Sequence, residues 1–358
     1  MSHCFSIIGL MSGTSLDGID LSYCDYTYTS DQWSYSIRAT KSYTYTSYWQ
    51  EKLKNAIHCS ALELYQLDIE LADLFSETVL EFISEFKFNT SEISALASHG
   101  HTIFHQPENE FTVQIGNGER IAVKTNLIVI NDFRSKDVAL KGQGAPLVPI
   151  GDHHLFSTFA DGFLNIGGIS NISFRTGTTI SAFDICPGNL PLNYLIQKIG
   201  IPFDKNGEHA RKGNLNLTLL NELNSLGFYS KLPPKSLGIE WIEANFFPVI
   251  SKHELSLSDQ LCTIVEHIAI QICKVSNEHH LQQLFITGGG AFHTYLIERI
   301  QHHFKGSVVI PSAQLIEFKE AIIFGFLGAC RLLLHPNCLS SVTGSIRDNC
   351  GGVIHIPN

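Results

Sequence analysis

The first residues suited to chemistry lie near the start of the chain, in GLMSGTSLDGID, residues 9–20. Glycine lets backbone N–H groups approach an anion closely. Such N–H groups combine with serine and threonine hydroxyls into turns that hold a phosphate group. The segment therefore predicts a phosphate-binding turn, made by Gly13, Thr14, Ser15, Leu16, Asp17, Gly18, Ile19 and Asp20.

Two carboxylates, those of Asp17 and Asp20, stand at the end of this turn. A carboxylate beside a phosphate is repelled unless a cation lies between them. Mg²⁺ is the cation that combines a few carboxylates with phosphate oxygens and water, so we expect Asp17 and Asp20 to hold Mg²⁺. The alternative is that Asp17-Gly18 is only the turn of a hairpin.

Two further glycine turns follow apolar runs later in the chain. They are Gly167-Gly168 in GFLNIGGISNIS and Gly288-Gly289-Gly290 in FITGGGAF. The first two turns share a design of strand, glycine turn and strand, which favours an internal duplication into two related halves. Neither of them fits the P-loop pattern or G-x-G-x-x-G. Ordinary turns between strands are the alternative.

A third carboxylate, Asp184, lies in SAFDICPGN, residues 181–189. It follows an apolar run and precedes Pro-Gly-Asn, which places it at a strand end facing a loop, the usual position of a ligand-facing group in an open α/β domain. Two alternatives stay open: the side chain caps a helix beginning near Leu190, or it closes an Asx turn. Cys186 is an unsuitable nucleophile, because no histidine lies near it in the sequence to activate it.

Strands and helices must position these residues, and the chain alternates the two, which indicates an α/β fold. Apolar runs and alternating patterns predict strands, whereas apolar residues at helical spacing predict helices. Strands are expected at 4–11, 18–29, 33–46 and 93–100, a strand–turn–helical turn–strand at 111–133, two strands around the turn of 162–176, a strand, glycine turn and helix at 282–300, and helices at 60–86 and 318–334.

Length, charge and cysteine content narrow the class of protein. A chain of 358 residues is longer than a single core usually tolerates, so two domains are the default. The net charge of −10 argues against a nucleic-acid or acidic-membrane partner. No apolar stretch reaches the roughly 18 residues of a membrane span, and MSHCFSII lacks the features of a signal peptide. The nine cysteines, odd in number and without a C-x-x-C pair, indicate reduced thiols and a cytoplasmic location.

The motifs together resemble those of the anhydro-N-acetylmuramic acid kinase family. The resemblance runs through nearly the whole chain, in GLMSGTSLDGID, SHGHTIFHQP, VQIGNGERIA, NDFRSKDVALKGQGAPLVP, FLNIGGISNIS, FDICPGN, PFDKNGEHARKG, PPKSLGIEW, FITGGGAF and SSVTG. It implies a two-domain actin/hexokinase-like ATPase fold, with a cleft between duplicated halves and ATP held by a hairpin from each. It also implies a reaction in which the anhydro bridge of a cell-wall sugar is cleaved with water and the freed oxygen is phosphorylated from ATP.

The resemblance further implies roles for single residues. Asp184 matches the family's general base, Glu320 matches a glutamate near the cleft, and the turn at residues 288–290 matches the adenosine end of the ATP site. The sugar side of the cleft is matched by His99, Gly100, His101, Thr102, Gln114, Asp132 and Arg134. The guanidinium of Arg134 would pair with the lactyl carboxylate of the small-molecule sugar.

Three alternatives to these roles stay open. Arg134 would instead form a surface ion pair with Asp132 or Asp137. Glu320 would be an acid in the first turn of its helix, favoured by the helix dipole. The histidines of HGHTIFH, residues 99–105, have the alternating spacing of metal ligands, but no cysteine or carboxylate completes a zinc site.

The chain departs from the family pattern at several positions, which are Ile185, Cys186, Asn193, Leu237, Ile239 and His293. The finer sugar contacts are therefore open, and a kinase of another anhydro sugar, such as levoglucosan, is one alternative. Another is a non-catalytic actin-like nucleotide-binding protein. The polar stretches at 99–106 and 132–144 argue against it, because such a protein would not need them.

The expected domain boundaries follow from the duplication and the family. A first α/β domain is expected at residues 1–134, a second at 135–319, and a C-terminal helix and tail at 320–358 packing back on the first domain. The sequence leaves a homodimer open.

Overall fold

The computed structural model describes residues 2–357 and divides them into two compact units. Unit 1 runs to Phe156 and resumes at Phe318, and unit 2 is Ser157–Glu317. The first boundary differs from the expected one at 134/135, because helix α5 (Val148–Leu155) packs within unit 1. A Cβ atom at Gly151 of this helix would lie 2.6 Å from Ile323, so the two segments are in direct contact. Within residues 2–357, no helix combines the length and the apolar character of a membrane span.

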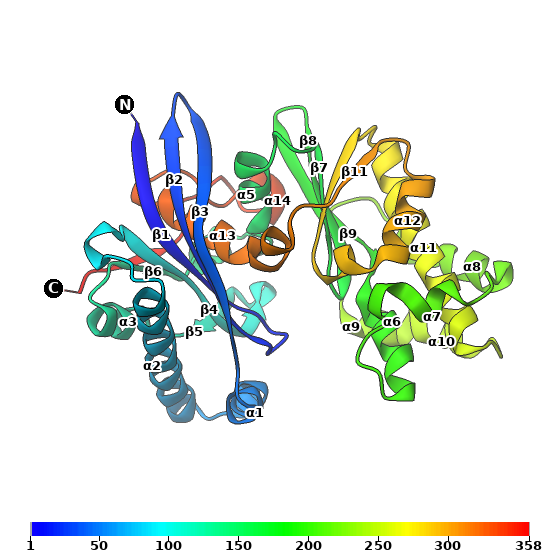
Figure 1. Ribbon diagram of the computed structural model, residues 1–358, viewed down its shortest axis with the longest axis horizontal. Helices are drawn as coiled ribbons and strands as arrows, with labels where there is room; N and C mark the ends of the chain where they lie inside the picture. The colour runs from blue at the N-terminus through cyan, green and yellow to red at the C-terminus, as the bar shows by residue number, and fades with distance from the viewer. Residues whose placement is uncertain (1, 358) are drawn as a thin grey trace. The chain divides into compact units, whose positions relative to one another are not determined.

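The sheet of unit 1 is mixed, and its strands lie in the order β12-β6-β4-β1-β2-β3, with β5 paired to β4 (Figure 1). Strands β1, β2 and β3 form an antiparallel meander, whereas β4 runs parallel to β1 and β6 runs parallel to β4. The strands are β1 (His3–Ser12), β2 (Gly18–Thr29), β3 (Gln32–Thr44), β4 (Ala95–Gln106), β5 (Phe111–Ile115), β6 (Val129–Asn131) and β12 (Val353–His355).

Helices cover both faces of this sheet. Helices α2 and α3 enclose a core with Ile8, Leu10 and other residues of one face. On the opposite face, a Cβ atom at Gly9 would lie 1.9 Å from the carbonyl oxygen of Ala321, so α13 crosses β1 at that glycine. The helices of unit 1 are α1 (Ser47–Asn55), η1 (Ala56–His58), α2 (Ala61–Glu85), η2 (Thr90–Glu92), η3 (Pro107–Asn109), α3 (Gly118–Thr125), α4 (Ser135–Ala139), α5, α14 (Ser340–Thr343) and α13 (Ala313–Leu332) from Phe318 onward.

The sheet of unit 2 repeats the strand order of unit 1. Its order is β11-β10-β7-β8-β9, with β7, β8 and β9 antiparallel, β10 parallel to β7, and β11 parallel to β10. The strands are β7 (Gly162–Ile166), β8 (Ile169–Thr176), β9 (Thr179–Pro187), β10 (Gln283–Thr287) and β11 (Ser307–Val309). Both units therefore have a three-stranded meander followed by two parallel strands beside its first strand. The predicted α/β fold with duplicated halves is confirmed.

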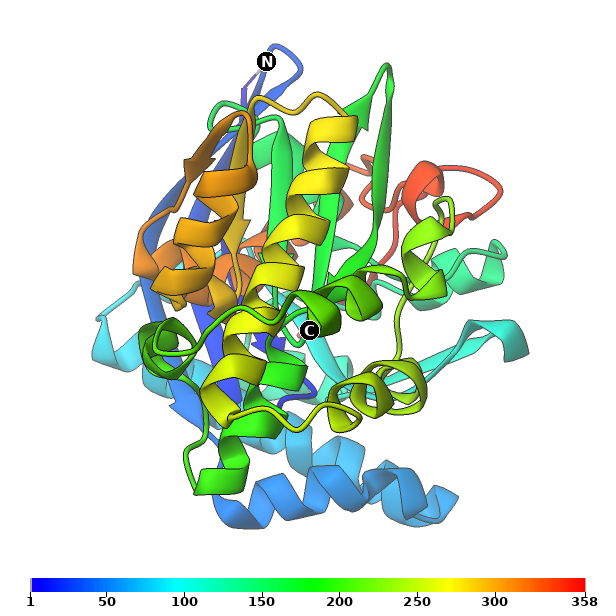
Figure 2. The ribbon, with the colours of Figure 1, turned by 90° about the vertical axis from the view of Figure 1, so that its right-hand side faces the viewer.

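Helices α11 and α12 lie in front of the unit 2 sheet in Figure 2, where they are yellow and orange. Apolar residues of both helices join β7, β9 and β10 in one core. The helices of unit 2 are α6 (Asn189–Ile196), η4 (Gln197–Ile199), η5 (Lys205–Gly207), α7 (Glu208–Arg211), α8 (Leu217–Asn224), η6 (Gly227–Ser230), α9 (Ile239–Trp241), the π-helical η7 (Ile242–Phe246), α10 (Phe247–Ser251), α11 (Leu257–Glu278), η8 (Gly289–Phe292) and α12 (Thr294–His303).

Most predicted elements differ from the observed ones by one to three residues at an end, and two differ by more. The strand expected at 93–100 continues as β4 to Gln106, because β5 supplies hydrogen-bond partners from His101 onward. The helix expected at 318–334 begins earlier, at Ala313, where Ser312 caps it by accepting a hydrogen bond from the backbone N–H of Leu315 at 3.3 Å.

Candidate functional site

The turn between β1 and β2 combines a left-handed residue with open space at one of its glycines. Leu16 has a φ of 61°, which is strained for a branched side chain, and its carbonyl accepts a hydrogen bond from Gln50 at 3.2 Å. A Cβ atom at Gly13 would meet nothing closer than Ser15 Oγ at 3.4 Å, whereas one at Gly18 would lie 2.2 Å from the carbonyl oxygen of Tyr43. Packing thus requires glycine at Gly18 but not at Gly13, where the open space suits the close approach of a ligand.

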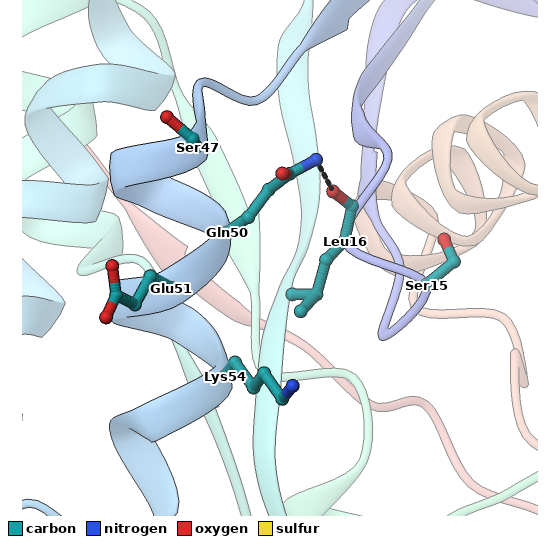
Figure 3. A pocket seen from close by; sticks show the side chains of 6 residues that line it. All are labelled: Ser15, Leu16, Ser47, Gln50, Glu51 and Lys54. Atoms are coloured by element: carbon teal, nitrogen blue, oxygen red, sulfur yellow. Dashed lines mark hydrogen bonds between the residues drawn. The ribbon is translucent and has the colours of Figure 1, made fainter.

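A hollow of about 450 Å³ lies between this turn and α1 (Figure 3). In the figure, the side chain of Gln50 points toward Leu16, and the dashed line marks its bond to the Leu16 carbonyl. The lining residues are Ser15, Leu16, Ser47, Gln50, Glu51 and Lys54.

The two aspartates of the turn differ in environment. Asp17 is exposed. Its backbone carbonyl accepts from the N–H of Tyr45 at 3.2 Å, next to the pair Gly18–Thr44 at one end of the β2–β3 ladder. Asp20 is half-buried on β2 and accepts a hydrogen bond from the hydroxyl of Ser42. Among residues 2–357, no three His, Cys, Asp or Glu side chains form a metal-binding group.

The charge of Asp20 also acts on Glu320 of α13. Burial raises the pKa of Glu320 most, and the negative charges of Asp20 and Asp152 raise it further. Lys319 and Arg134 oppose this rise in the pKa. The Glu320 residue is exposed at one side, so its carboxylate is only partly removed from water and lies within a group of charges.

Glu320 is not in the first turn of its helix, so that alternative is wrong. It is the eighth residue of α13, whose first turn holds no acidic residue. The helix dipole acts mainly on the first and last turns, and it therefore does not explain a glutamate here.

Buried hydroxyl and imidazole groups form a chain of hydrogen bonds at the end of β1, just before the first turn. Ser12 Oγ lies 2.7 Å from the hydroxyl of Tyr45 and 2.8 Å from Nδ1 of His101. Burial lowers the pKa of His101 to about 4, so the ring is neutral at pH 7. His101, expected on the sugar side, is thus bonded to Ser12 at the end of β1, next to the first glycine turn. Ser12, within the first motif, was missed as a supporting residue.

Arg134 is bonded to His99 and to the backbone. Its Nη2 and Nε lie 2.9 and 3.2 Å from Nε2 of His99, and its Nη1 donates to the carbonyl of Gly144 at 2.7 Å. Burial, together with the charge of Arg134, lowers the pKa of His99 to about 3. Nε2 of the neutral ring therefore accepts from Arg134, and Nδ1–H donates to the carbonyl of Gly100 at 2.9 Å.

The alternative of an ion pair at Arg134 is wrong. Asp132 Oδ1 accepts from the backbone N–H of Ser135 at 3.1 Å, and Asp137 is fully buried among other donors. Within residues 2–357, Arg134 takes part in no ion pair. Its guanidinium therefore keeps its charge available for an anion.

The remaining residues expected on the sugar side also lie on these strands of unit 1. Gln114 of β5 donates to Thr102 of β4 at 3.3 Å and to Thr112 at 2.7 Å. Gly100 and Asp132 have φ angles of 72° and 53°. Aspartate is among the non-glycine residues that adopt the left-handed backbone of Asp132 most readily. Pairing of β4 with β5 and β6 gathers most of the predicted sugar residues at one end of the sheet.

In unit 2, the second and third glycine turns lie side by side. Packing requires glycine at Gly288 and Gly290, where a Cβ atom would lie 2.7 and 2.2 Å from atoms of the Asn165–Ile166 segment. At Gly167 a Cβ atom would meet nothing within 3.4 Å, so this glycine again leaves room for a ligand. Asn189 lies between the turns, since its Nδ2 donates to the Ile166 carbonyl at 3.2 Å and its N–H to Gly167 at 2.9 Å. Asn189 is not among the predicted site residues, although it is the last residue of the FDICPGN motif.

Asp184 lies on β9, next to a β-bulge. Asn171 pairs with Asp184 but Ser170 pairs with Cys186, so the intervening Ile185 is the extra residue. Bulges re-aim neighbouring side chains. Burial raises the pKa of the half-buried Asp184 carboxyl, and the N–H of Leu237, which donates to Oδ2 at 2.8 Å, opposes this rise. Among residues 2–357 no other donor bonds this carboxylate, so Oδ1 has no hydrogen-bond partner there.

The alternatives for this segment are wrong. Helix α6 begins at Asn189 with Gly188 as its N-cap and without a side-chain cap, so Asp184 does not cap it. The Asp184 carboxylate bonds a residue far along the chain rather than closing an Asx turn. Burial raises the pKa of Cys186 to about 12, which keeps its thiol protonated and excludes it as a nucleophile at pH 7.

The family model and the curated relatives that match this chain bear the same name. A family model described as "Anhydro-N-acetylmuramic acid kinase" matches residues 5–357. Proteins of that name from Sulfurimonas denitrificans and Haemophilus influenzae are each 34% identical to this chain, covering 97% and 94% of it and 98% and 94% of their own lengths. Among solved structures, a ROK family glucokinase from Streptomyces griseus in complex with glucose and AMPPNP is 9% identical, covers 90% of this chain and 98% of its own, and has a TM-score of 0.40.

Proposed function

Because this chain belongs to the anhydro-N-acetylmuramic acid kinase family, we propose that it uses ATP and water to open the 1,6-anhydro bridge of anhydro-N-acetylmuramic acid and to phosphorylate the freed 6-oxygen. The protein is an ATP-dependent sugar kinase of peptidoglycan recycling. The ring-opening step is supported by the Asp184 carboxylate. Its Oδ2 accepts a hydrogen bond from the N–H of Leu237, and its Oδ1 has no partner among residues 2–357.

Asp184 is the proposed general base. A water molecule attacks the anomeric carbon and gives its proton to the free Oδ1, while the bond between that carbon and the bridging oxygen breaks. The raised pKa makes Asp184 a stronger base than an ordinary aspartate once it is ionised. The attack resembles that of inverting glycosidases, which need two carboxylates. Here the bridging oxygen leaves toward the phosphoryl group, so one carboxylate suffices and the anomeric centre is inverted.

The glycine turns fit a nucleotide triphosphate. Gly13 and Gly167 both leave space that protein atoms do not fill, and glycine there permits N–H groups to approach phosphates. We propose that residues Gly13–Asp20 and Gly167-Gly168 hold the phosphates and that Gly288-Gly289-Gly290 lies toward the adenosine. When bound, ATP with Mg²⁺ supplies the phosphoryl group and neutralises the charge that develops on it.

The carboxylates at the first turn are the proposed Mg²⁺ ligands. Asp17 is exposed and Asp20 half-buried, and Mg²⁺ is commonly bound through one or two carboxylates and water. The negative charge of Asp20 raises the pKa of the Glu320 carboxyl group. We therefore propose that Glu320 would act beside the metal site and the transferred phosphoryl group, as a carboxylate that orients water there by accepting hydrogen bonds.

The polar end of the unit 1 sheet is the proposed sugar site. Arg134 pairs with the lactyl carboxylate through N–H groups not used by His99 and Gly144. Gly100, Thr102, Gln114 and Asp132 line the sugar. His99 and His101 act by holding Arg134 and Ser12, because both are buried and bonded to those residues. A cytoplasmic location is proposed from the odd number of cysteines and their lack of C-x-x-C spacing.

Replacement of Asp184 by asparagine tests the proposal, because it keeps the shape and removes the basicity. Turnover of anhydro-N-acetylmuramic acid should fall by about a hundredfold or more, while the Kd for ATP stays within about twofold. ADP release and the mass of the sugar product report the two halves of the reaction. The matched control is Asp161→Asn, at an aspartate that accepts from the backbone N–H groups of Gln282 and Gln283. Near-normal turnover of Asp184→Asn would exclude Asp184 as the base.

A further inference from the structure

Besides its pairing with Asn171 of β8, Asp184 bonds two backbone groups of one segment of unit 2, residues 226–238. The N–H of Asp184 donates to the carbonyl of Lys235 at 3.1 Å, and the N–H of Leu237 donates to Oδ2 at 2.8 Å. The position of the carboxylate therefore depends on the position of this segment.

The middle of the segment is not buried. After η6 it crosses residues 231–234, which are all exposed, before it reaches Lys235. Its buried side chains lie on both sides of this stretch, at Phe228 of η6, which is 2% exposed, and at Leu237, which is 8% exposed. The Nζ atom of Lys235 lies 4.7 Å from the centre of the Phe228 ring. Lys235, whose carbonyl bonds Asp184, therefore packs against the buried Phe228 of η6.

The second attachment is Tyr229, the neighbour of Phe228. Its hydroxyl lies 2.8 Å from Nε2 of His267, a fully buried residue of α11. Nδ1 of the same ring lies 2.7 Å from Oδ1 of Asn224, which also accepts from Nε2 of Gln271 at 2.8 Å. These four side chains join η6, α8 and α11.

The donors and acceptors of this network are all assigned by its geometry. Because Asn224 Oδ1 is an acceptor, Nδ1 of His267 carries the proton. Nε2 is therefore the acceptor, and Tyr229 donates to it. Burial lowers the pKa of His267 to about 3, which keeps the ring neutral and preserves this pattern near pH 7. A protonated ring would have no acceptor for Tyr229.

We propose that Tyr229 and His267 are positioning residues for the reaction. The hydrogen bond between them fixes the segment 226–238, and this segment in turn keeps the Asp184 carboxylate within hydrogen-bond distance of the attacking water. The inference rests on the proposed role of Asp184 as the base. Neither residue is required to touch a ligand, and both act through the backbone groups of Lys235 and Leu237.

The first test is Tyr229→Phe, which removes one hydroxyl and keeps the ring contacts. Because small displacements of a catalytic group slow the chemical step, we expect kcat for the sugar to fall about tenfold while both KM values stay within about twofold. The matched control is Tyr28→Phe in unit 1, where the lost hydroxyl donates only to Asp31. An unchanged kcat in Tyr229→Phe would overturn the proposal.

A double variant separates positioning from a general structural effect. If Tyr229 acts through Asp184, Tyr229→Phe should cost nothing further in an Asp184→Asn background. A tenfold loss that recurs in that background would show that Tyr229 acts elsewhere, and would overturn the proposal. The failure of the base assignment is distinct, because it appears as near-normal turnover of the single variant Asp184→Asn.

Rescue at His267 gives an independent measurement. Glutamine offers an N–H for Asn224 and a carbonyl for Tyr229, so His267→Gln should keep kcat within about threefold, whereas His267→Leu should lose at least as much as Tyr229→Phe. Equal kcat values for the Gln and Leu variants would contradict the hydrogen-bonding role.

Discussion

The guanidinium of Arg134 lies against a neutral histidine rather than a carboxylate, with Nη2 2.9 Å from Nε2 of His99. This contact orients the guanidinium without compensating its charge. An arginine held in this way near the surface end of a sheet is suited to bind an anionic group of a ligand.

Arg134→Lys should therefore weaken the binding of a substrate that carries a carboxylate. A charge-assisted hydrogen bond contributes roughly 1.5–3 kcal/mol, so we expect KM for anhydro-N-acetylmuramic acid to rise about 10- to 100-fold. Levoglucosan lacks the lactyl carboxylate, and any turnover of that sugar should be unaffected by the change. Arg120→Lys, at an exposed ion pair with Asp73, is the control. Equal losses for both sugars would argue against the carboxylate contact.

Gly13→Ala should impair ATP binding without harming the fold. The new Cβ atom meets no protein atom closer than 3.4 Å, but it would occupy the space proposed for a phosphate. We expect the Kd for ATP to rise at least about tenfold by calorimetry, with an unchanged Tm. In Gly18→Ala, the Cβ atom would lie 2.2 Å from a backbone oxygen, so the free energy of unfolding should fall by about 1–3 kcal/mol. Normal ATP affinity in Gly13→Ala would place the phosphates elsewhere.

Three buried histidines should make the protein sensitive to mild acid. Burial lowers the pKa of His99 and His267 to about 3 and that of His101 to about 4, against about 6.5 in the unfolded chain. The unfolded state therefore binds protons first, and stability is lost as the pH falls below about 6.5. Each ring contributes a slope of at most about 1.4 kcal/mol per pH unit. Urea unfolding between pH 7.5 and 5 should show the decline.

A variant identifies the source of this decline. His267→Gln removes one of the three groups, so its free energy of unfolding should depend less steeply on pH than that of the wild type. An identical slope would show that His267 is not buried in its neutral form.

Asp137→Ala should destabilise unit 1 through its C-terminal tail. The fully buried carboxylate accepts from the backbone N–H of Gly144 at 2.8 Å and, from the tail, Cys338 at 3.0 Å and Thr343 and Asn349 at 2.9 Å each. Loss of the acceptor leaves these donors unpaired, at a cost of about 2–4 kcal/mol in the free energy of unfolding. The exposed cap of Ser340, tested by Asp348→Ala, should cost under about 1.5 kcal/mol. A similar small loss at Asp137 would contradict its role.

The sequence by itself determined the strands, the duplicated halves and the chemistry-bearing motifs. The predicted strand 18–29 matches β2 residue for residue, because a run of apolar and strand-forming side chains that starts at a glycine is a local signal in the sequence. The glycine turns were recognised for the same local reason, since a turn and its flanking strands are contiguous in the chain. The family resemblance added the roles, which rest on motif order rather than on local physics.

Only the tertiary structure decided which groups hold these residues in place. Asp184 is held by backbone groups of Lys235 and Leu237, and backbone groups carry no sequence signal. Arg134 contacts His99, 35 residues away, instead of the nearby Asp132 and Asp137. The first domain extends to Phe156 because α5 packs against the distant α13. Such choices depend on long-range packing and on competition among many polar partners, which a linear pattern does not record.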